Sequence, residues 1–84
     1  MAREYTRVIT KKLVKAYLTL NRGRHVTSNE MASWINDPNN RFGLKSNISP
    51  KTIGRMIKDS QWDKSNILYD VEIIEGHPNR YVLK

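Results

Sequence analysis

Three cations and a hydroxyl group are spaced so that they share one side of a short predicted helix. Lys51, Arg55 and Lys58 recur at i, i+4 and i+7, and Thr52 lies beside them. Lysine binds phosphate oxygens as a compact charge, whereas arginine can also pair with guanine through two hydrogen bonds, the commonest specific base contact. The chemistry that this spacing favours is therefore the binding of a polyanion, not the making or breaking of bonds.

The same segment carries the signals that begin a helix. Ser49 is a strong N-cap residue, and Pro50 fits the first helical position, where its missing N–H costs nothing. Ile48 and Ile53 can pack against each other as a hydrophobic staple. We therefore expect a helix over about 50–60. Its inward face consists of three apolar side chains, Ile53, Met56 and Ile57.

A glycine interrupts this predicted helix. Gly54 costs about 1 kcal/mol relative to alanine inside a helix, so its presence needs a reason. A residue without a Cβ allows another group to come close. Two candidates for that group are the preceding helix and a phosphate backbone, and the sequence leaves both open.

The N-terminal quarter of the chain predicts a long amphipathic helix over about 4–20. Val14 and Leu18 lie outside its main apolar arc, so they either pack under a sheet or form a seam to a second copy of the chain. The arc itself consists of Tyr5, Ile9, Leu13, Ala16, Tyr17 and Leu20. A basic stripe on another side consists of Arg7, Lys11 and Lys15.

A second, shorter helix is expected from Ser28 to about Ile35. Thr27 and Glu30 form a capping box, in which the hydroxyl accepts from the amide of residue 30 and the glutamate side chain reaches back. Pro38 disfavours helix at the residue before it and so stops the segment. The inward side of this helix consists of Met31, Ala32 and Ile35.

A polar connection over 36–47 separates the second helix from the third. Phe42 and Leu44 are expected to attach this connection to the core. Arg41 and Lys45 are candidates for additional phosphate contacts. The connection is thus expected to be a loop with two apolar anchors and two cations.

The C-terminal part of the chain predicts two strands that pair as an antiparallel hairpin. Residues 67–74 alternate in the manner of a strand, and residues 80–83 form the closing strand. The residues between them, 75–79, have the composition of a turn. A short extended link at 25–26 precedes the second helix and is a candidate for a minimal third strand.

The two tryptophans are expected in different places. Trp34 lies on the second helix and is either the edge of the core or an exposed anchor for a partner. Trp62 lies in the turn 61–66 after the third helix and is expected to cover the core.

Length and composition narrow the class of protein. A chain of 84 residues fits a single domain, 1–84. Its formal net charge of +7 favours a polyanionic partner, and residues 1–24 hold seven of the lysines and arginines. Because there is no cysteine, and because His25 and His77 have no ligand-spaced companions, we expect no metal and no cofactor. No small-molecule ligand is evident either.

Catalysis and membrane insertion are not expected. No paired acids, nucleophile–base set or glycine-rich phosphate loop occurs, which argues against an enzyme. No apolar run approaches the roughly 18–20 residues that span a bilayer. The first residues lack the apolar segment of a secretory signal, so a cytoplasmic location is expected.

The expected elements follow the order helix, short strand, helix, helix and two-stranded hairpin. With the segments 26–32, 49–57 and 80–83, this order resembles the winged helix-turn-helix domain, an α+β fold, over essentially the whole chain. The resemblance implies that the third helix lies in the major groove of double-stranded DNA and that the hairpin, or wing, touches the backbone or the minor groove. It implies a DNA-binding protein, such as a small transcriptional regulator.

The resemblance and the residue chemistry together give the candidate DNA-binding residues. From the third helix, the cations reach base edges or phosphates, and Thr52 reaches a thymine methyl group or a phosphate. The first amides of the second helix, at Ser28 and Asn29, are placed to bind a phosphate. The full set is Lys51, Thr52, Arg55, Lys58, Ser28, Asn29, Arg41, Lys45, His77, Asn79 and Arg80.

Two features depart from the family pattern. The connection 36–47 has about a dozen residues, whereas the turn of a helix-turn-helix has about three or four, so it could change the angle of the third helix. Glu75 at the base of the wing weakens a contact between the wing and the minor groove.

An alternative class is a winged-helix module for protein–protein interaction or oligomerisation without DNA readout. In that alternative an apolar patch is formed by Trp34, Trp62, Val14 and Leu18. A homodimer also fits the DNA-binding hypothesis, because DNA sites often mirror the two-fold symmetry of the protein.

Overall fold

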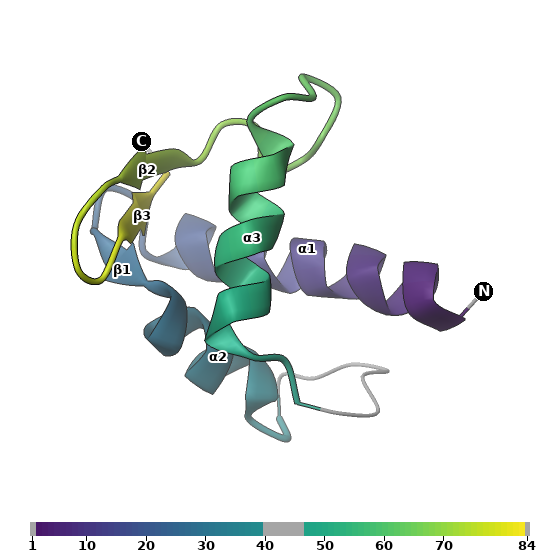
Figure 1. Ribbon diagram of the computed structural model, residues 1–84. Coiled ribbons are helices and arrows are strands. Elements are labelled where there is room, and N and C mark those ends of the chain that lie inside the picture. Colours follow the sequence, from purple (N-terminus) through teal and green to yellow (C-terminus); the bar gives the residue numbers. More distant parts are fainter. Residues whose placement is uncertain (1, 40–46, 84) are drawn as a thin grey trace.

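The computed structural model describes residues 2–39 and 47–83, and side chains from residue 8 onward. The described elements follow the order α1, β1, α2, α3, β2, β3 (Figure 1). Their bounds are α1 Ala2–Leu20, β1 Val26–Thr27, α2 Ser28–Asn36, α3 Pro50–Ser60, β2 Glu72–Ile74 and β3 Arg80–Val82. The expected α+β class, with three helices and an antiparallel sheet, is confirmed.

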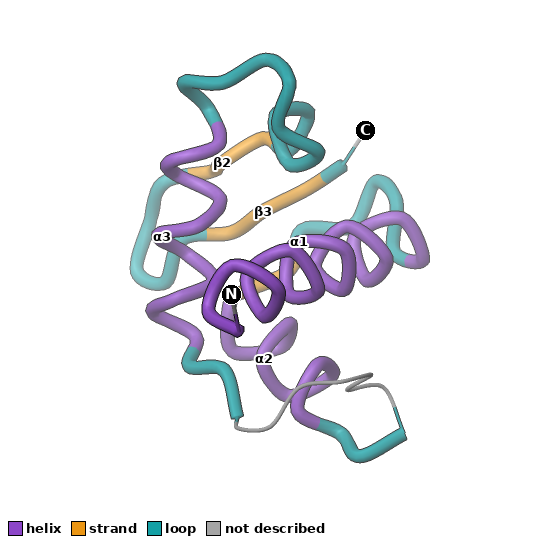
Figure 2. The backbone as a smooth tube through the Cα atoms, turned by 90° about the vertical axis from the view of Figure 1, so that its right-hand side faces the viewer, coloured by secondary structure: helices purple, strands orange, loops and turns teal. Residues whose placement is uncertain are grey.

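The three strands form one antiparallel sheet with β3 in the centre. Tyr81 in β3 lies opposite Val26 in β1 and opposite Ile73 in β2. The short link before α2 is thus a real strand, displaced by one residue from the expected 25–26. Figure 2 shows β2 and β3 running next to each other beside α3. The sheet therefore connects the hairpin to the start of α2.

The predicted starts of the two shorter helices are confirmed by their caps. The Thr27 hydroxyl accepts from the Glu30 amide at 3.2 Å, and the Ser49 hydroxyl accepts from the Thr52 amide at 3.2 Å. The Glu30 carboxylate is bound by Arg24 at 2.9 Å. Both caps replace a partner that the first turn of a helix lacks, which is why local sequence was sufficient to locate them.

The core lies where the three helices meet the sheet, and α3 runs across α1 (Figure 1). The apolar arc predicted for α1 was partly wrong, because Val14 and Leu18 are fully buried while Leu20 is 73% exposed. The reason is that the chain after α3 returns over α1: Leu68 is buried in the same core, and the Lys15 ammonium donates to the carbonyl of Ile67 at 3.0 Å. No seam to a second copy is left at these two positions.

The segment after α3 is mostly turns, and the strand predicted over 67–74 was too long. The Tyr69 amide donates to the Asn66 carbonyl, and the Val71 amide donates to the Leu68 carbonyl. Only Glu72–Ile74 pairs as a strand. Turn hydrogen bonds satisfy the backbone here, so Leu68 can enter the core without a strand partner.

The two tryptophans differ in environment. Trp34 packs at the edge of the core, with its ring 5.4 Å from the ring of Tyr17. Trp62 does not cover the core, because 88% of its surface is exposed. The expected anchors Phe42 and Leu44, the cations Arg41 and Lys45, and the side chain of Tyr5 lie outside the described residues.

No helix in the described part of the chain is both long and apolar enough to cross a membrane.

Candidate nucleic-acid interface

Helix α3 has one buried face and one exposed cationic face. Ile53 and Ile57 are fully buried, and Met56 is half-buried against the core. Lys51, Arg55 and Lys58, here called the basic row, are all exposed, as is Thr52. The expected division of this helix between core and solvent is confirmed.

No ion pair neutralises the basic row among the described residues. Other cations of the chain are occupied within the fold: Lys15 pairs with Asp70 at 3.6 Å, and Arg24 pairs with Glu30 at 2.9 Å. An unpaired cation keeps its full attraction for a phosphate, whereas a paired one must first lose its partner. The three cations of the basic row are therefore available to an anion, whereas Lys15 and Arg24 already have acidic partners.

A side chain that the sequence did not indicate fixes the direction of α3. The amide of Asn36, the last residue of α2, donates to the Ile48 carbonyl at 2.9 Å and accepts from the Ile48 amide at 2.8 Å. These two hydrogen bonds join the end of α2 to the residue before the N-cap of α3. The direction of α3 is thus held by a direct bridge between the two helices, and the length of the connection 36–47 matters less than expected.

The neighbour of Gly54 in the fold is the sheet and not the preceding helix, which was one of the two candidates expected from the sequence. A Cβ at this position would lie 3.1 Å from the hydroxyl oxygen of Tyr81. Tyr81 belongs to the central strand and is 5% exposed. The missing side chain therefore leaves room for the Tyr81 hydroxyl beside α3.

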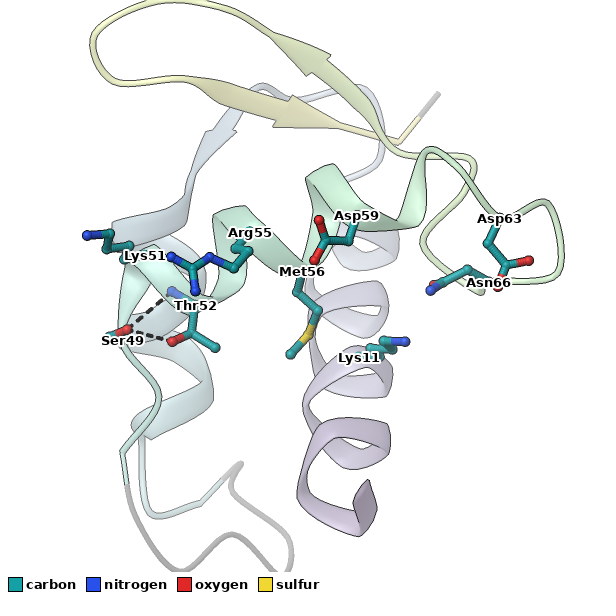
Figure 3. Close-up of a pocket in the computed structure, with 9 residues that line it drawn as sticks. All are labelled: Lys11, Ser49, Lys51, Thr52, Arg55, Met56, Asp59, Asp63 and Asn66. Atoms are coloured by element: carbon teal, nitrogen blue, oxygen red, sulfur yellow. Dashed lines mark hydrogen bonds between the residues drawn. The ribbon is translucent and has the colours of Figure 1, made fainter. Parts of the chain in front are cut away.

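A hollow of about 380 Å³ lies between α3 and α1 (Figure 3). Lys51, Thr52 and Arg55 project from α3 at one end, and Lys11 lies on the side of α1. Lys11 was recognised in the sequence only as part of a basic stripe, and the structure brings it to the hollow that Lys51 and Arg55 also line. Figure 3 shows Lys11 on the side of Asp63, whose pKa its charge helps to lower, and not beside Lys51 and Arg55.

The other end of this hollow carries the opposite charge. It is lined by Asp59 and Asp63. The hydroxyl of Ser65 donates to the Asp63 carboxylate at 2.6 Å and its amide donates at 3.0 Å, and these bonds lower the pKa of Asp63. Asp63 is therefore ionised at neutral pH, so the hollow is attractive to an anion only at the end near Ser49.

A second hollow, of about 560 Å³, lies between the end of α3 and the hairpin. Lys58 and Trp62 line it on the side of α3, and His77 and Asn79 line it on the side of the hairpin. The Asn79 side chain accepts from the Gly76 amide at 2.9 Å, so its oxygen is already used to shape the turn. Of the wing candidates, His77 and Asn79 are exposed and line this hollow, whereas Arg80 is exposed but does not line it.

The remaining candidates lie elsewhere on the fold. Arg80 is exposed on β3, and Ser28 and Asn29 form the first turn of α2. None of these three lines either hollow next to α3. The structure thus brings Lys58 together with His77 and Asn79 at one hollow, and it places Lys51, Thr52 and Arg55 at the other. The α2 candidates remain a separate place for a phosphate.

Comparisons with known proteins add no relative to this geometry. No family model, no curated protein and no solved structure matches the chain. Within residues 2–39 and 47–83, no three His, Cys, Asp or Glu side chains are grouped closely enough to hold a metal ion. The function has to be argued from the surface itself.

Proposed function

We propose that this chain is a winged-helix protein that binds double-stranded DNA with α3 in the major groove, as a small transcriptional regulator does. The single observation that carries the proposal is the basic row, three exposed cations on one helix that no described acid neutralises. The order of elements and the sheet order β1–β3–β2 are compatible with the winged-helix fold. The cytoplasmic location expected from the sequence remains part of this proposal.

The dimensions of α3 suit a groove of DNA. Its 11 residues give a length of about 16 Å at 1.5 Å per residue, and the major groove is about 12 Å wide and admits a helix. Arg55 lies near the middle of the basic row, where it would meet base edges. Lys51 and Lys58 lie one turn to either side, where they would meet the flanking phosphates.

Thr52 would contribute its methyl group more than its hydroxyl. The two hydroxyl oxygens of Ser49 and Thr52 are 2.9 Å apart and share a hydrogen bond. The Thr52 hydroxyl therefore already has a partner in the N-cap, and the methyl group is left for a thymine. In this arrangement His77 and Arg80 of the hairpin, and the α2 amides at Ser28 and Asn29, would contact the backbone.

Most of the apolar patch on which the alternative of a protein-interaction module depends is not exposed. Of its four apolar side chains, Val14 and Leu18 are buried, and Trp34 packs against the core. Only Trp62 remains exposed. No observation therefore favours that alternative over DNA binding, and the homodimer remains a separate proposal that sedimentation at two protein concentrations would test.

The test is duplex binding measured at several salt concentrations with Arg55→Ala and Lys12→Ala as a matched pair. Both variants remove one cation from an exposed helical position. If three cations contact phosphates, log Kd should change with log salt with a slope of at least about 2.7 in magnitude, at about 0.9 per phosphate. Arg55→Ala should weaken binding by about 1–3 kcal/mol if it reads a base, while Lys12→Ala should change little.

Two results would contradict the proposal. Equal losses from Arg55→Ala and Lys12→Ala would mean that attraction is spread over the whole surface and that α3 reads nothing. An absence of duplex binding even at low salt would remove double-stranded DNA as the partner. An NMR titration with the duplex locates the binding surface, because the proposal requires chemical-shift changes clustered on residues 49–58.

A further inference from the structure

Trp62 is the most exposed large apolar side chain in the described part of the chain. Its exposed fraction is 88%, compared with 73% for Leu20 and 50% for Val8. Its backbone is held in place, since its amide donates to the Asp59 carbonyl at 3.3 Å. An indole that packs on nothing adds no core stability and has a flat face available for a ligand.

The position of Trp62 continues the basic row. Residues 51, 55, 58 and 62 follow at i, i+4, i+7 and i+11, and the backbone remains helical at Gln61, with φ −67° and ψ −14°. The turn also continues at the next residue, where the Asp63 amide donates to the Ser60 carbonyl at 3.2 Å. The indole therefore lies at the end of the line of cations on which we place the DNA.

The hollow beside Trp62 suits a neutral flat group better than a phosphate. It has a volume of about 560 Å³, within the range of about 300–1,000 Å³ that is usual for small-ligand sites. Lys58 lines its α3 side, while Glu75 and Ile73 line its hairpin side. The carboxylate of Glu75 would repel a phosphate there, but it can accept a hydrogen bond from the amino group of a base.

A continuous duplex offers such an indole nothing to stack on. In paired DNA the faces of the bases are covered by their neighbours, and only the edges are open in the grooves. A base that is unpaired, at an overhang or a gap, has a free face, and stacking on an aromatic side chain is the usual way in which proteins hold it. Lys58, one turn before Trp62, is placed for the phosphate next to that base.

We propose that the hollow between α3 and the hairpin takes an unpaired nucleobase stacked on Trp62, so that the chain prefers DNA in which a duplex meets a single strand. The inference rests on the proposed function for the duplex part of the site, which the basic row holds. The base site itself is formed by Trp62, Lys58 and Glu75.

The experiment uses Trp34→Phe as the parent protein, so that all tryptophan emission comes from Trp62. The probes are a two-stranded duplex with blunt ends, the same duplex with a short single-stranded overhang, and the overhang strand alone. We expect quenching of Trp62 by the overhang probe and a Kd for it at least about fivefold lower than for the blunt duplex, given the usual strength of base–aromatic stacking. The blunt duplex should bind with little quenching.

Two further variants are compared in the same assay by fluorescence anisotropy of labelled DNA. Trp62→Ala should remove the preference for the overhang and leave the affinity for the blunt duplex within about twofold, because base stacking is the contribution that it deletes. Leu20→Ala removes another exposed apolar side chain, away from both hollows, and should leave the preference unchanged.

The outcomes separate this inference from the proposed function. If the blunt duplex and the duplex with the overhang bind equally and Trp62 emission does not change, the base site is refuted while duplex binding stands. If the single strand quenches Trp62 but no duplex binds, the base site stands and the duplex function fails. If no DNA changes the emission of Trp62, the inference is refuted, and an apolar partner surface becomes the explanation for the exposed indole.

Discussion

The contact between Gly54 and Tyr81 makes a prediction about stability with two opposing terms. Alanine in place of glycine inside a helix normally stabilises by about 1 kcal/mol. At this position the new methyl group would lie 3.1 Å from the Tyr81 hydroxyl oxygen, closer than an ordinary van der Waals contact. The net effect of Gly54→Ala depends on whether Tyr81 can move by a few tenths of an ångström.

The surroundings of Tyr81 indicate that it cannot move freely. It is 5% exposed and lies in the central strand, paired on one side with Val26 and on the other with Ile73. Overpacking of this kind costs about 1–3 kcal/mol. Subtracting the helical gain of about 1 kcal/mol, we expect Gly54→Ala to destabilise the protein by about 0–2 kcal/mol.

A second substitution separates the two terms. Tyr81→Phe removes only the hydroxyl oxygen, which is the atom in conflict with the new methyl group. In that background Gly54→Ala should stabilise by up to about 1 kcal/mol, because the propensity term acts alone. The double-mutant cycle should therefore give a coupling energy of about 1–3 kcal/mol, in the direction that makes Gly54→Ala less destabilising when the Tyr81 hydroxyl is absent.

The assay is urea unfolding of the four proteins followed by circular dichroism, with the m-value checked for constancy. If Gly54→Ala stabilises the protein by the full helical term with Tyr81 present, the hydroxyl gives way at no cost. The close approach of the sheet would then not be the reason for the glycine. Additive effects of Gly54→Ala and Tyr81→Phe would also mean that the Tyr81 hydroxyl is not the reason for the glycine.

Two more predictions test the parts that position the site. Asn36→Ala should destabilise by about 1–3 kcal/mol because it leaves the half-buried N–H and C=O of Ile48 without their partners. Unfolding midpoints measure this, and an unchanged midpoint for Asn36→Ala would contradict the bridge. Asn36→Asp keeps the acceptor but sets a carboxylate oxygen against the Ile48 carbonyl, so it should also lower the midpoint relative to the unsubstituted protein. Ser65→Ala should raise the pKa of Asp63, as followed by NMR titration, because it removes the strongest hydrogen bond to the carboxylate. The pKa of Asp63 is lowered in the folded protein, so its contribution to stability is present above the unfolded pKa and is lost as pH falls through the folded pKa. Ser65→Ala should therefore reduce the loss of stability that Asp63 contributes at acid pH. An unchanged pKa of Asp63 in Ser65→Ala would refute the cause assigned.

Local signals explain why the helices α2 and α3 could be predicted almost to the residue. The N-caps Thr27 and Ser49 act within three residues, and a proline at the first helical position acts on its own backbone. The basic row followed from the same periodicity, since a helix with one apolar face must present its other residues to solvent. These parts of the candidate site needed no knowledge of the rest of the chain.

The errors concern contacts between segments that are distant in sequence. The burial of Val14 and Leu18 depends on where residues 66–71 return after α3, and the alternation over 67–74 could not show that Leu68 would enter the core from a turn. Trp62, expected to cover the core, is exposed, because its side chain depends on where the turn after α3 is placed. The bridge of Asn36 to Ile48 and the approach of Tyr81 to Gly54 also join separate elements, and no local pattern indicates them.

The acids beside α3 limit the side from which a polyanion can approach. Asp59 and Asp63 line the hollow toward α1, and Asp63 is kept ionised by Ser65. A phosphate backbone that passed between α3 and α1 would meet these carboxylates, each costing about 1 kcal/mol or more at a few ångströms in a partly aqueous setting. The favourable path for a nucleic-acid strand therefore follows the basic row from Lys51 to Lys58 and continues toward the hairpin. There Glu75 is the only carboxylate that lines the second hollow. That line ends at Trp62, so the charges direct the strand to the one large aromatic face left uncovered on the described surface.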